Sequence, residues 1–159
     1  MHFLFLRCIF RGMKDSSIRV LLADDDIDDC LLFQDALTEL ELTEKTTLAT
    51  AKDGDQLMRT LLDENRIPDV LFLDLNMPRK NGFECLVSIM SNNTTKDIPV
   101  IIFSTSFNPD IVKLLHAKGA RRYIRKPEDF ESLKSVIKKG LSAIEDVEPI
   151  PFNRFVVNA

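Results

Sequence analysis

Five short strand-like runs, each followed by a segment of helical periodicity, restrict the fold of this chain more than any other feature. The runs lie at Ile18–Ala23, Thr46–Ala51, Val70–Asp74, Val100–Ser104 and Arg121–Arg125. The helical segments lie at Ile27–Leu40, Asp55–Leu62, Gly82–Met90, Pro109–Ala117 and Phe130–Ile144. Strands that alternate with helices through short connections predict an α/β fold, with a doubly wound five-stranded parallel sheet covered on both faces.

Polar residues mark the ends of two of the predicted helices. Asp26 is placed to cap the first helix, and Asp28 and Asp29 follow in its first turn, where carboxylates favour the helix dipole. We interpret these three acids as a cap and dipole partners rather than as metal ligands. Gly119 is expected to end the fourth helix, as a glycine after a helix commonly does.

Carboxylates follow two of the predicted buried strands. Asp24 and Asp25 come directly after the first strand, and Asp74 closes the third. Parallel sheets bind their ligands at the carboxyl ends of the strands, where the strand order reverses. Like charges brought together at such an edge are costly unless a cation neutralises them. The pattern therefore indicates a divalent-metal site, with one carboxylate left free for chemistry.

A hydroxyl and an ammonium group are expected at the same edge. Ser104 ends the fourth strand, and Lys126 with Pro127 follows the fifth. Together with the acids, these groups have the chemistry of phosphoryl transfer to a carboxylate, which needs a nucleophile, a hard cation and groups that hold phosphoryl oxygens.

At this point the chain, over roughly residues 17–143, resembles the receiver domain of two-component response regulators. The resemblance rests on residues at the spacing of the family's motifs. Each match alone is weak evidence for the family, and together they are strong evidence. They are Asp24, Asp25, Asp74, Asn76, Met77, Pro78, Gly82, Ser104, Tyr123, Lys126 and Pro127. It implies the flavodoxin-like (βα)5 fold with strand order 2-1-3-4-5. It also implies a signalling domain that catalyses only its own phosphorylation and dephosphorylation, rather than an enzyme.

The resemblance assigns roles to individual residues. Asp74 is the expected phospho-acceptor. Asp25, Asp74 and the backbone carbonyl of Asn76 are expected to ligate Mg²⁺ or Mn²⁺, with Asp24 acting directly or through water. Lys126 is expected to pair with one phosphoryl oxygen, and Ser104 to bond another. The Lys126–Pro127 bond is implied to be cis.

The resemblance also implies a switch. When the Ser104 hydroxyl moves toward the phosphoryl group, Tyr123 fills the vacated space, and a partner reads the changed surface of the fourth helix, fifth strand and fifth helix. Two alternatives stay open at this stage. Thr105 is the neighbouring candidate for the switch hydroxyl, and Tyr123 is equally well interpreted as a core tyrosine with its hydroxyl at the rim.

Two other function classes compete with the phosphorylated receiver. A phosphatase of the haloacid-dehalogenase type also has a strand-end aspartate and Mg²⁺, but it needs a second aspartate two residues later, where this chain has Asn76. An interaction module that has lost phosphorylation usually lacks an acid or the lysine, and this chain keeps both.

The implied partners are proteins. A sensor histidine kinase or a histidine phosphotransfer protein would supply the phosphoryl group, and an unidentified protein target would read it. A homodimer is a further option. The net charge of −4, without interleaved basic and aromatic residues, argues against nucleic acid.

The sequence divides into a predicted extension at 1–16, a receiver domain at 17–145 and a tail at 146–159. The tail is too short for an output domain, so a stand-alone receiver is expected; the tail could pack on its own domain, join a dimer or be disordered. The apolar run in the first twelve residues is too short, and too broken by Arg7, to span a membrane. The three cysteines, Cys8, Cys30 and Cys85, are odd in number and widely spaced, and Cys30 and Cys85 are expected as buried free thiols; a reducing cytoplasm fits this pattern.

Overall fold

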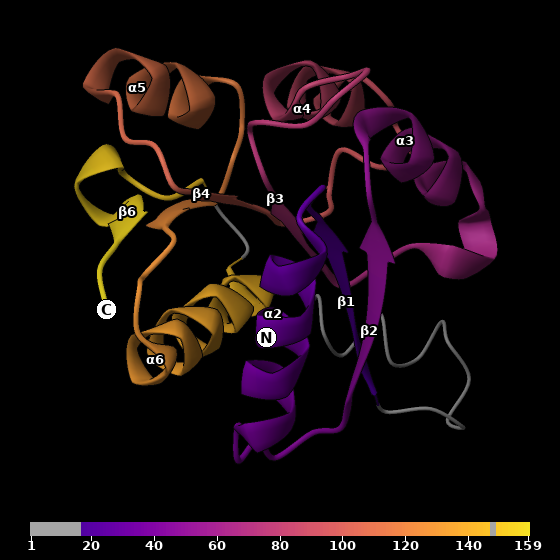
Figure 1. The fold of residues 1–159 in the computed structure, drawn as a ribbon. Coiled ribbons are helices and arrows are strands. Elements are labelled where there is room, and N and C mark those ends of the chain that lie inside the picture. Colours follow the sequence, from indigo (N-terminus) through magenta and orange to yellow (C-terminus); the bar gives the residue numbers. More distant parts are fainter. Residues whose placement is uncertain (1–16, 147–148) are drawn as a thin grey trace.

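A six-stranded parallel sheet, with helices on both faces, forms the body of the protein (Figure 1). The computed structural model describes residues 17–146 and 149–159. The strand order is β2-β1-β3-β4-β5-β6. The predicted order of five strands is therefore confirmed, and a sixth strand that was not predicted extends the sheet beyond β5. The predicted extension at 1–16, with Cys8, lies outside the described residues.

The observed elements agree closely with the predicted ones. The strands are β1 Ile18–Ala23, β2 Thr46–Ala51, β3 Val70–Leu73, β4 Val100–Ser104, β5 Arg122–Arg125 and β6 Val156–Val157. The α-helices are α2 Ile27–Glu39, α3 Gly54–Leu62, α4 Gly82–Met90, α5 Pro109–Ala117 and α6 Phe130–Leu141. Short 3-10 turns lie at η1 Glu64–Arg66, η2 Ser142–Glu145 and η3 Phe152–Arg154. The last predicted helix thus ends earlier, and η2 continues it. None of the helices in the described part of the chain is long and apolar enough to cross a membrane.

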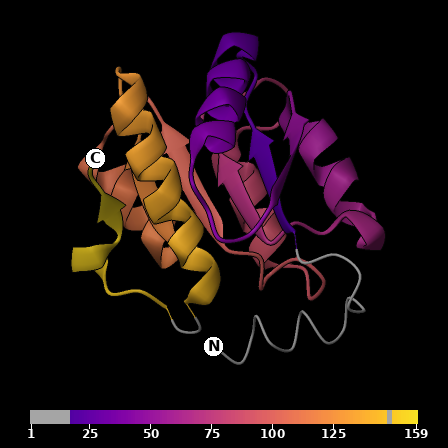
Figure 2. The same ribbon diagram turned by 90° about the horizontal axis from the view of Figure 1, so that it is seen from below.

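The helices divide between the two faces of the sheet. Helices α2 and α6 lie side by side on one face (Figure 2), whereas α3, α4 and α5 cover the other. Strand β3 illustrates why both faces are covered. Leu71 and Leu73 point into the core under α3, α4 and α5, while Val70 and Phe72 point into the core under α2 and α6. All four residues are fully buried, as expected for a central parallel strand.

The two predicted helix ends are confirmed. The Asp26 carboxylate caps α2, accepting hydrogen bonds from the backbone N–H groups of Asp28 and Asp29. Gly119 follows α5 with a φ of 102°, a left-handed conformation that favours glycine. Asp26 thus ends the loop after the carboxyl end of β1, whereas Gly119 leads from α5 to the amino end of β5.

The reversal in strand order lies at β1. The chain passes from β1 to β2 on one side and returns to β3 on the other, so β1 pairs in parallel with both. The loops that follow β1 and β3 consequently diverge at this point. A parallel sheet leaves its binding crevice at this switch point.

Residues 149–159 pack against the domain, which is the first of the three options for the tail. Strand β6 pairs in parallel with β5, and the Tyr123 N–H donates to the Phe155 carbonyl oxygen at 2.9 Å. The Phe155 side chain is fully buried in the core under α5. On the same side, a 2.6 Å hydrogen bond joins His116 Nε2 and the Ile150 carbonyl oxygen. The tail is therefore attached by both backbone and side-chain contacts.

Candidate functional site

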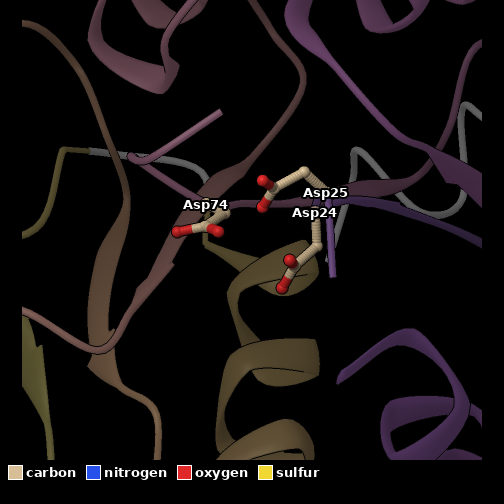
Figure 3. Close-up of side chains that lie close together, drawn as sticks. All are labelled: Asp24, Asp25 and Asp74. Carbon is tan, nitrogen blue, oxygen red and sulfur yellow. The ribbon is translucent and has the colours of Figure 1, made fainter. Parts of the chain in front are cut away.

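Three carboxylates meet at the switch point of the sheet (Figure 3). Asp24 follows β1 and Asp74 follows β3; both are buried, while Asp25 is exposed at the rim. One oxygen of each carboxylate lies within 4.8 Å of the others. Backbone hydrogen bonds hold the two buried residues, from Asp24 N–H to the Ala51 carbonyl at 3.0 Å and from Asp74 N–H to the Ala23 carbonyl at 2.9 Å. The sheet therefore brings together the three acids that the strand ends predicted.

A glycine keeps the segment after Asp74 close to the next helix. Gly82, the first residue of α4, donates its N–H to the Leu75 carbonyl oxygen at 3.0 Å. A Cβ atom at position 82 would lie 2.2 Å from the Asp74 carbonyl oxygen. Only a residue without a side chain fits here, so Gly82 allows α4 to begin directly against the loop that carries the acceptor candidate.

The Lys126 ammonium lies among these carboxylates. Its Nζ is 2.6 Å from Asp24 Oδ2, 2.9 Å from Asp29 Oδ2 and 3.5 Å from Asp74 Oδ2. The Lys126 side chain is only 10% exposed, so these contacts are largely shielded from water. The structure contains no cis peptide bond among its described residues. The cis Lys126–Pro127 bond implied by the resemblance is therefore wrong; the bond is trans.

Burial shapes the electrostatics of the site. It raises the pKa of Asp74 to about 6, although the nearby Lys126 charge lowers it; the Asp24 charge raises it further. Burial alone would lower the pKa of Lys126, but its hydrogen bonds to Asp24 and Asp29 and the Asp74 charge hold that pKa above its ordinary value. A single ammonium thus compensates the carboxylates only in part, and the site attracts further positive charge.

The donor set fits a hard divalent cation. Asp24, Asp25 and Asp74 offer oxygen ligands at one point, and carboxylate oxygens are preferred by Mg²⁺ and Mn²⁺. Asn76 follows two residues after Asp74, and its backbone N–H donates to Asp74 Oδ1 at 3.3 Å. Asn76 therefore lies beside the acceptor candidate, and the role of its carbonyl as a metal ligand stays a prediction.

Ser104 and Tyr123 are connected through Ser106. The Ser104 Oγ is 3.1 Å from Ser106 Oγ and accepts the Ser106 N–H at 3.3 Å. The Tyr123 hydroxyl donates to the Ser106 carbonyl oxygen. Ser104 is fully buried and Thr105 is exposed, which favours Ser104 as the switch hydroxyl. The link through Ser106 was not predicted, since sequence spacing does not show which way two loops turn toward each other.

The Tyr123 ring is buried in the core, as both interpretations of this residue require. It is 1% exposed, and burial raises the pKa of its hydroxyl. The Phe107 ring packs edge-on against it at 5.6 Å between centroids, and Phe155 lies at 6.5 Å. Tyr123 therefore joins the loop after β4 to the C-terminal tail.

Asp29 is the functional candidate that the sequence did not indicate. The sequence placed it in the first turn of α2 as a dipole partner, and it does lie there. Its contact with Lys126 arises because α2 and α6 share one face, so the loop before α6 meets the start of α2. Only the short spacing from Asp24, which places the first turn of α2 just beyond the end of β1, could have hinted at this contact.

The two described cysteines are free thiols, as predicted, and the Cys30 thiol donates to the Asp24 carbonyl oxygen at 3.7 Å. Burial raises the pKa of Cys30 and of Cys85 to about 11 in each case. The thiolate is the reactive form, so neither group is suited to act as a nucleophile.

Comparison with known proteins identifies one family. A sequence model of the response regulator receiver domain matches residues 20–138. The probable chemotaxis protein CheY of Rhizobium etli is 30% identical over 128 residues, which cover 80% of this chain and 95% of that protein. Response regulator Rcp1 of Synechocystis is 29% identical over 124 residues, covering 75% of this chain and 83% of the relative.

Solved structures agree with this result. The Mn²⁺-bound form of Rcp1 superposes with a TM-score of 0.71 at 29% identity, covering 84% of this chain and 99% of that one. The phosphorylated cyanobacterial phytochrome response regulator RcpA gives a TM-score of 0.71 at 30% identity, covering 85% of this chain and 99% of that one.

Proposed function

This chain belongs to the response regulator receiver domain family, and from that premise we propose that Asp74 accepts a phosphoryl group from a phosphohistidine. The observation that carries the proposal is the position of Asp74. It is a buried carboxylate at the end of β3, within 4.8 Å of two further carboxylates and 3.5 Å from the Lys126 ammonium. Receiver domains are signalling domains, and phosphorylation of this kind is general to them.

The transfer exchanges one bond to phosphorus for another. An oxygen of the ionised Asp74 carboxylate forms the new P–O bond as the P–N bond to the donor imidazole breaks. The electron pair of that bond returns to the imidazole nitrogen, which takes up a proton. Asp74 enters this reaction deprotonated, and Asp24, Asp25, Asp74 and the Asn76 carbonyl would hold Mg²⁺ or Mn²⁺ beside it. The cation, when bound, offsets the repulsion between Asp74 and the incoming phosphoryl oxygens.

Lys126 and Ser104 then hold the product. Lys126 approaches from the loop after β5 and pairs with one phosphoryl oxygen. Ser104, at the end of β4, donates its hydroxyl to another. In doing so, the hydroxyl leaves its present contact with Ser106 Oγ. The Ser106 carbonyl also accepts the Tyr123 hydroxyl, so the same movement is transmitted to the buried tyrosine.

The output surface of this switch is formed by α5, β5 and α6. Tyr123 lies on β5 and contacts Phe107 before α5, and its backbone supports the tail. A change at Ser104 therefore alters the packing of the elements that a downstream protein would contact. Since relatives include a phytochrome response regulator, a photoreceptor kinase is one phosphohistidine donor to test, beside other sensor kinases and phosphotransfer proteins.

Intact-mass spectrometry after incubation with acetyl phosphate and Mg²⁺ tests the site. We expect one phosphoryl adduct on the wild type, and none on Asp74→Ala or in the presence of a chelator. Asp69→Ala is a matched control, since Asp69 is a buried acid at the opposite end of β3; it should still be phosphorylated if folded. A folded wild type that binds Mg²⁺ but takes no phosphoryl group would instead support an interaction module without phosphorylation.

The chain provides its own optical reporter of the switch. Tyr123 is its single tyrosine, and it has no tryptophan. Tyrosine emission therefore reports on this side chain alone. A change in emission on phosphorylation, absent in Ser104→Ala, would support the proposed coupling between the two residues.

A further inference from the structure

The Lys126 ammonium lies closer to two other carboxylates than to the proposed acceptor. Its Nζ is 2.6 Å from Asp24 and 2.9 Å from Asp29, but 3.5 Å from Asp74. An ammonium group has three N–H donors. Two of them donate hydrogen bonds to Asp24 and Asp29, while Asp74 lies at ion-pair distance. A phosphoryl oxygen on Asp74 therefore meets an ammonium group that two other carboxylates already hold.

Asp29 differs from the other two partners in its origin. It belongs to the first turn of α2, whereas Asp24 and Asp74 follow strands. It also lies outside the group of three carboxylates that could hold a cation together. Binding of a cation therefore engages Asp24 and Asp74 but leaves Asp29 free to retain the lysine.

The neighbouring acids in the same turn provide a comparison. Asp26 is used as the cap of α2. Asp28 is exposed, and no ion pair joins it to any residue within 17–146 or 149–159. The Asp29 side chain is 34% exposed and reaches the buried Lys126. Asp28 and Asp29 do not cap the helix, and of these two only Asp29 contacts Lys126.

We propose that Asp29 is a positioning residue that holds Lys126 toward α2 in the unphosphorylated protein and competes for it with the phosphoryl group. The inference rests on the proposed phosphorylation of Asp74. Two effects act in the same direction. The hydrogen bond to Asp29 holds the ammonium group toward α2 and away from the phosphoryl group, and the negative charge of Asp29 repels the phosphoryl oxygens. Asp29 therefore opposes accumulation of the phosphorylated state.

The test compares Asp29→Asn with Asp28→Asn. Both variants remove one negative charge from the same helical turn, but only the first removes a partner of Lys126. With Mg²⁺ saturating, we expect Asp29→Asn to bind the phosphoryl analogue fluoroberyllate about tenfold more tightly, a change of the size of one charge-assisted hydrogen bond. Fluorine NMR of the bound analogue measures this affinity. Phosphorylation by acetyl phosphate should accelerate in the same variant.

Magnesium affinity gives a second readout that needs no phosphorylation. Lys126 released from Asp29 pairs more fully with Asp24 and Asp74, which the cation must then displace. Mg²⁺ alone, measured by titration calorimetry, should therefore bind Asp29→Asn more weakly, although fluoroberyllate binds it more tightly. A general loss of structure would weaken both. Asp29→Glu keeps the carboxylate and should restore both affinities toward those of the wild type.

The outcomes separate this inference from the proposed function. Equal changes in Asp29→Asn and Asp28→Asn would show a simple charge effect and overturn the positioning role. Weaker fluoroberyllate binding by Asp29→Asn would also overturn it. A wild type that takes no phosphoryl group would refute the proposed function. In that case, an unchanged Mg²⁺ affinity in Asp29→Asn would overturn the positioning role as well. Weaker Mg²⁺ binding by Asp29→Asn, but not by Asp28→Asn, would support the Asp29–Lys126 contact.

Discussion

At the residue scale, the site depends on one ammonium group shared among three carboxylates. Lys126 is the nearest positive charge to Asp24 and Asp74, both of which are almost fully buried. Removing one partner of a buried ion pair leaves the other charge uncompensated. We therefore expect the lysine to stabilise the fold without a cation and to compete with a cation for the same oxygens.

Lys126→Met separates these two effects. We expect the variant to lose about 3 kcal/mol of unfolding free energy in chelator, because Asp24 and Asp74 remain buried without their ammonium. We also expect it to bind Mg²⁺ more tightly by about tenfold, equivalent to about 1.4 kcal/mol. Urea unfolding with and without Mg²⁺ measures the first effect, and titration calorimetry measures the second.

A lysine on α6 provides the control. Lys134 pairs with Glu39 and Glu131, which are both exposed. Exposed ion pairs contribute about 0–1 kcal/mol, so Lys134→Met should change stability little and Mg²⁺ affinity not at all. Weaker Mg²⁺ binding by Lys126→Met would show that the lysine supports the cation rather than competing with it.

Most of the contacts at this scale were predictable because they depend on strand ends. Asp24, Asp74, Ser104 and Lys126 each follow a strand that the sequence marks clearly, and parallel strands end at one edge of the sheet. The Asp29 contact was not predictable in this way. It depends on the meeting of α2 with the loop before α6, and the spacing of residues along the chain does not contain that distance.

At the scale of elements, the order of the strands determines which loops form the site. Strands β1, β3 and β4 were recognisable because buried strands carry continuous apolar runs, whereas β2 and β5 were predicted from strand-like runs between helical segments. Strand β6 was missed because it contains only Val156 and Val157. So short a run has no periodicity, and it becomes a strand only by pairing with β5.

Gly82→Ala tests how closely α4 must approach β3. A methyl group would meet the Asp74 carbonyl oxygen at 2.2 Å, so the loop that carries Asp74 must shift. We expect a loss of about 1–3 kcal/mol in unfolding free energy, which is typical of overpacking, together with weaker Mg²⁺ binding. Denaturant unfolding and calorimetry measure the two quantities.

Gly119→Ala is the matched control. Gly119 has a φ of 102°, and a Cβ atom added there would meet the Met90 side chain rather than the Asp74 loop. Strain at such a position costs on the order of 1–3 kcal/mol, so this variant should lose comparable stability and keep its Mg²⁺ affinity. A Gly82→Ala protein with normal Mg²⁺ affinity would show that the acceptor loop tolerates the shift.

At the scale of the whole molecule, the tail is part of the folded domain. Phe155 lies in the same core as Leu115 of α5 and Tyr123 of β5. Beside it, the Arg122 guanidinium pairs with the Asp146 carboxylate at 2.9 Å. Residues 149–159 should therefore unfold together with the sheet rather than separately.

Phe155→Ala tests this cooperativity. Truncating a buried phenylalanine costs about 3–5 kcal/mol, and we expect a loss of this size in a single unfolding transition. Phe152→Ala, in the same tail but 42% exposed, should cost less than about 1 kcal/mol. Tyr123 emission should follow the same transition as circular dichroism. A separate early loss of tail contacts in the wild type would contradict the prediction.

The position of β6 has a consequence for self-association. Unpaired strand edges attract further strands, and a very short edge strand limits such pairing. With two residues, β6 ends the sheet beside β5, whereas β2 presents the outer edge of a six-residue strand on the other side. A copy or partner that extends the sheet therefore has its longer template at β2. Sheet extension there would leave α5, α6 and the tail accessible, so association through β2 and the proposed phosphorylation-dependent recognition would occupy opposite sides of the same molecule.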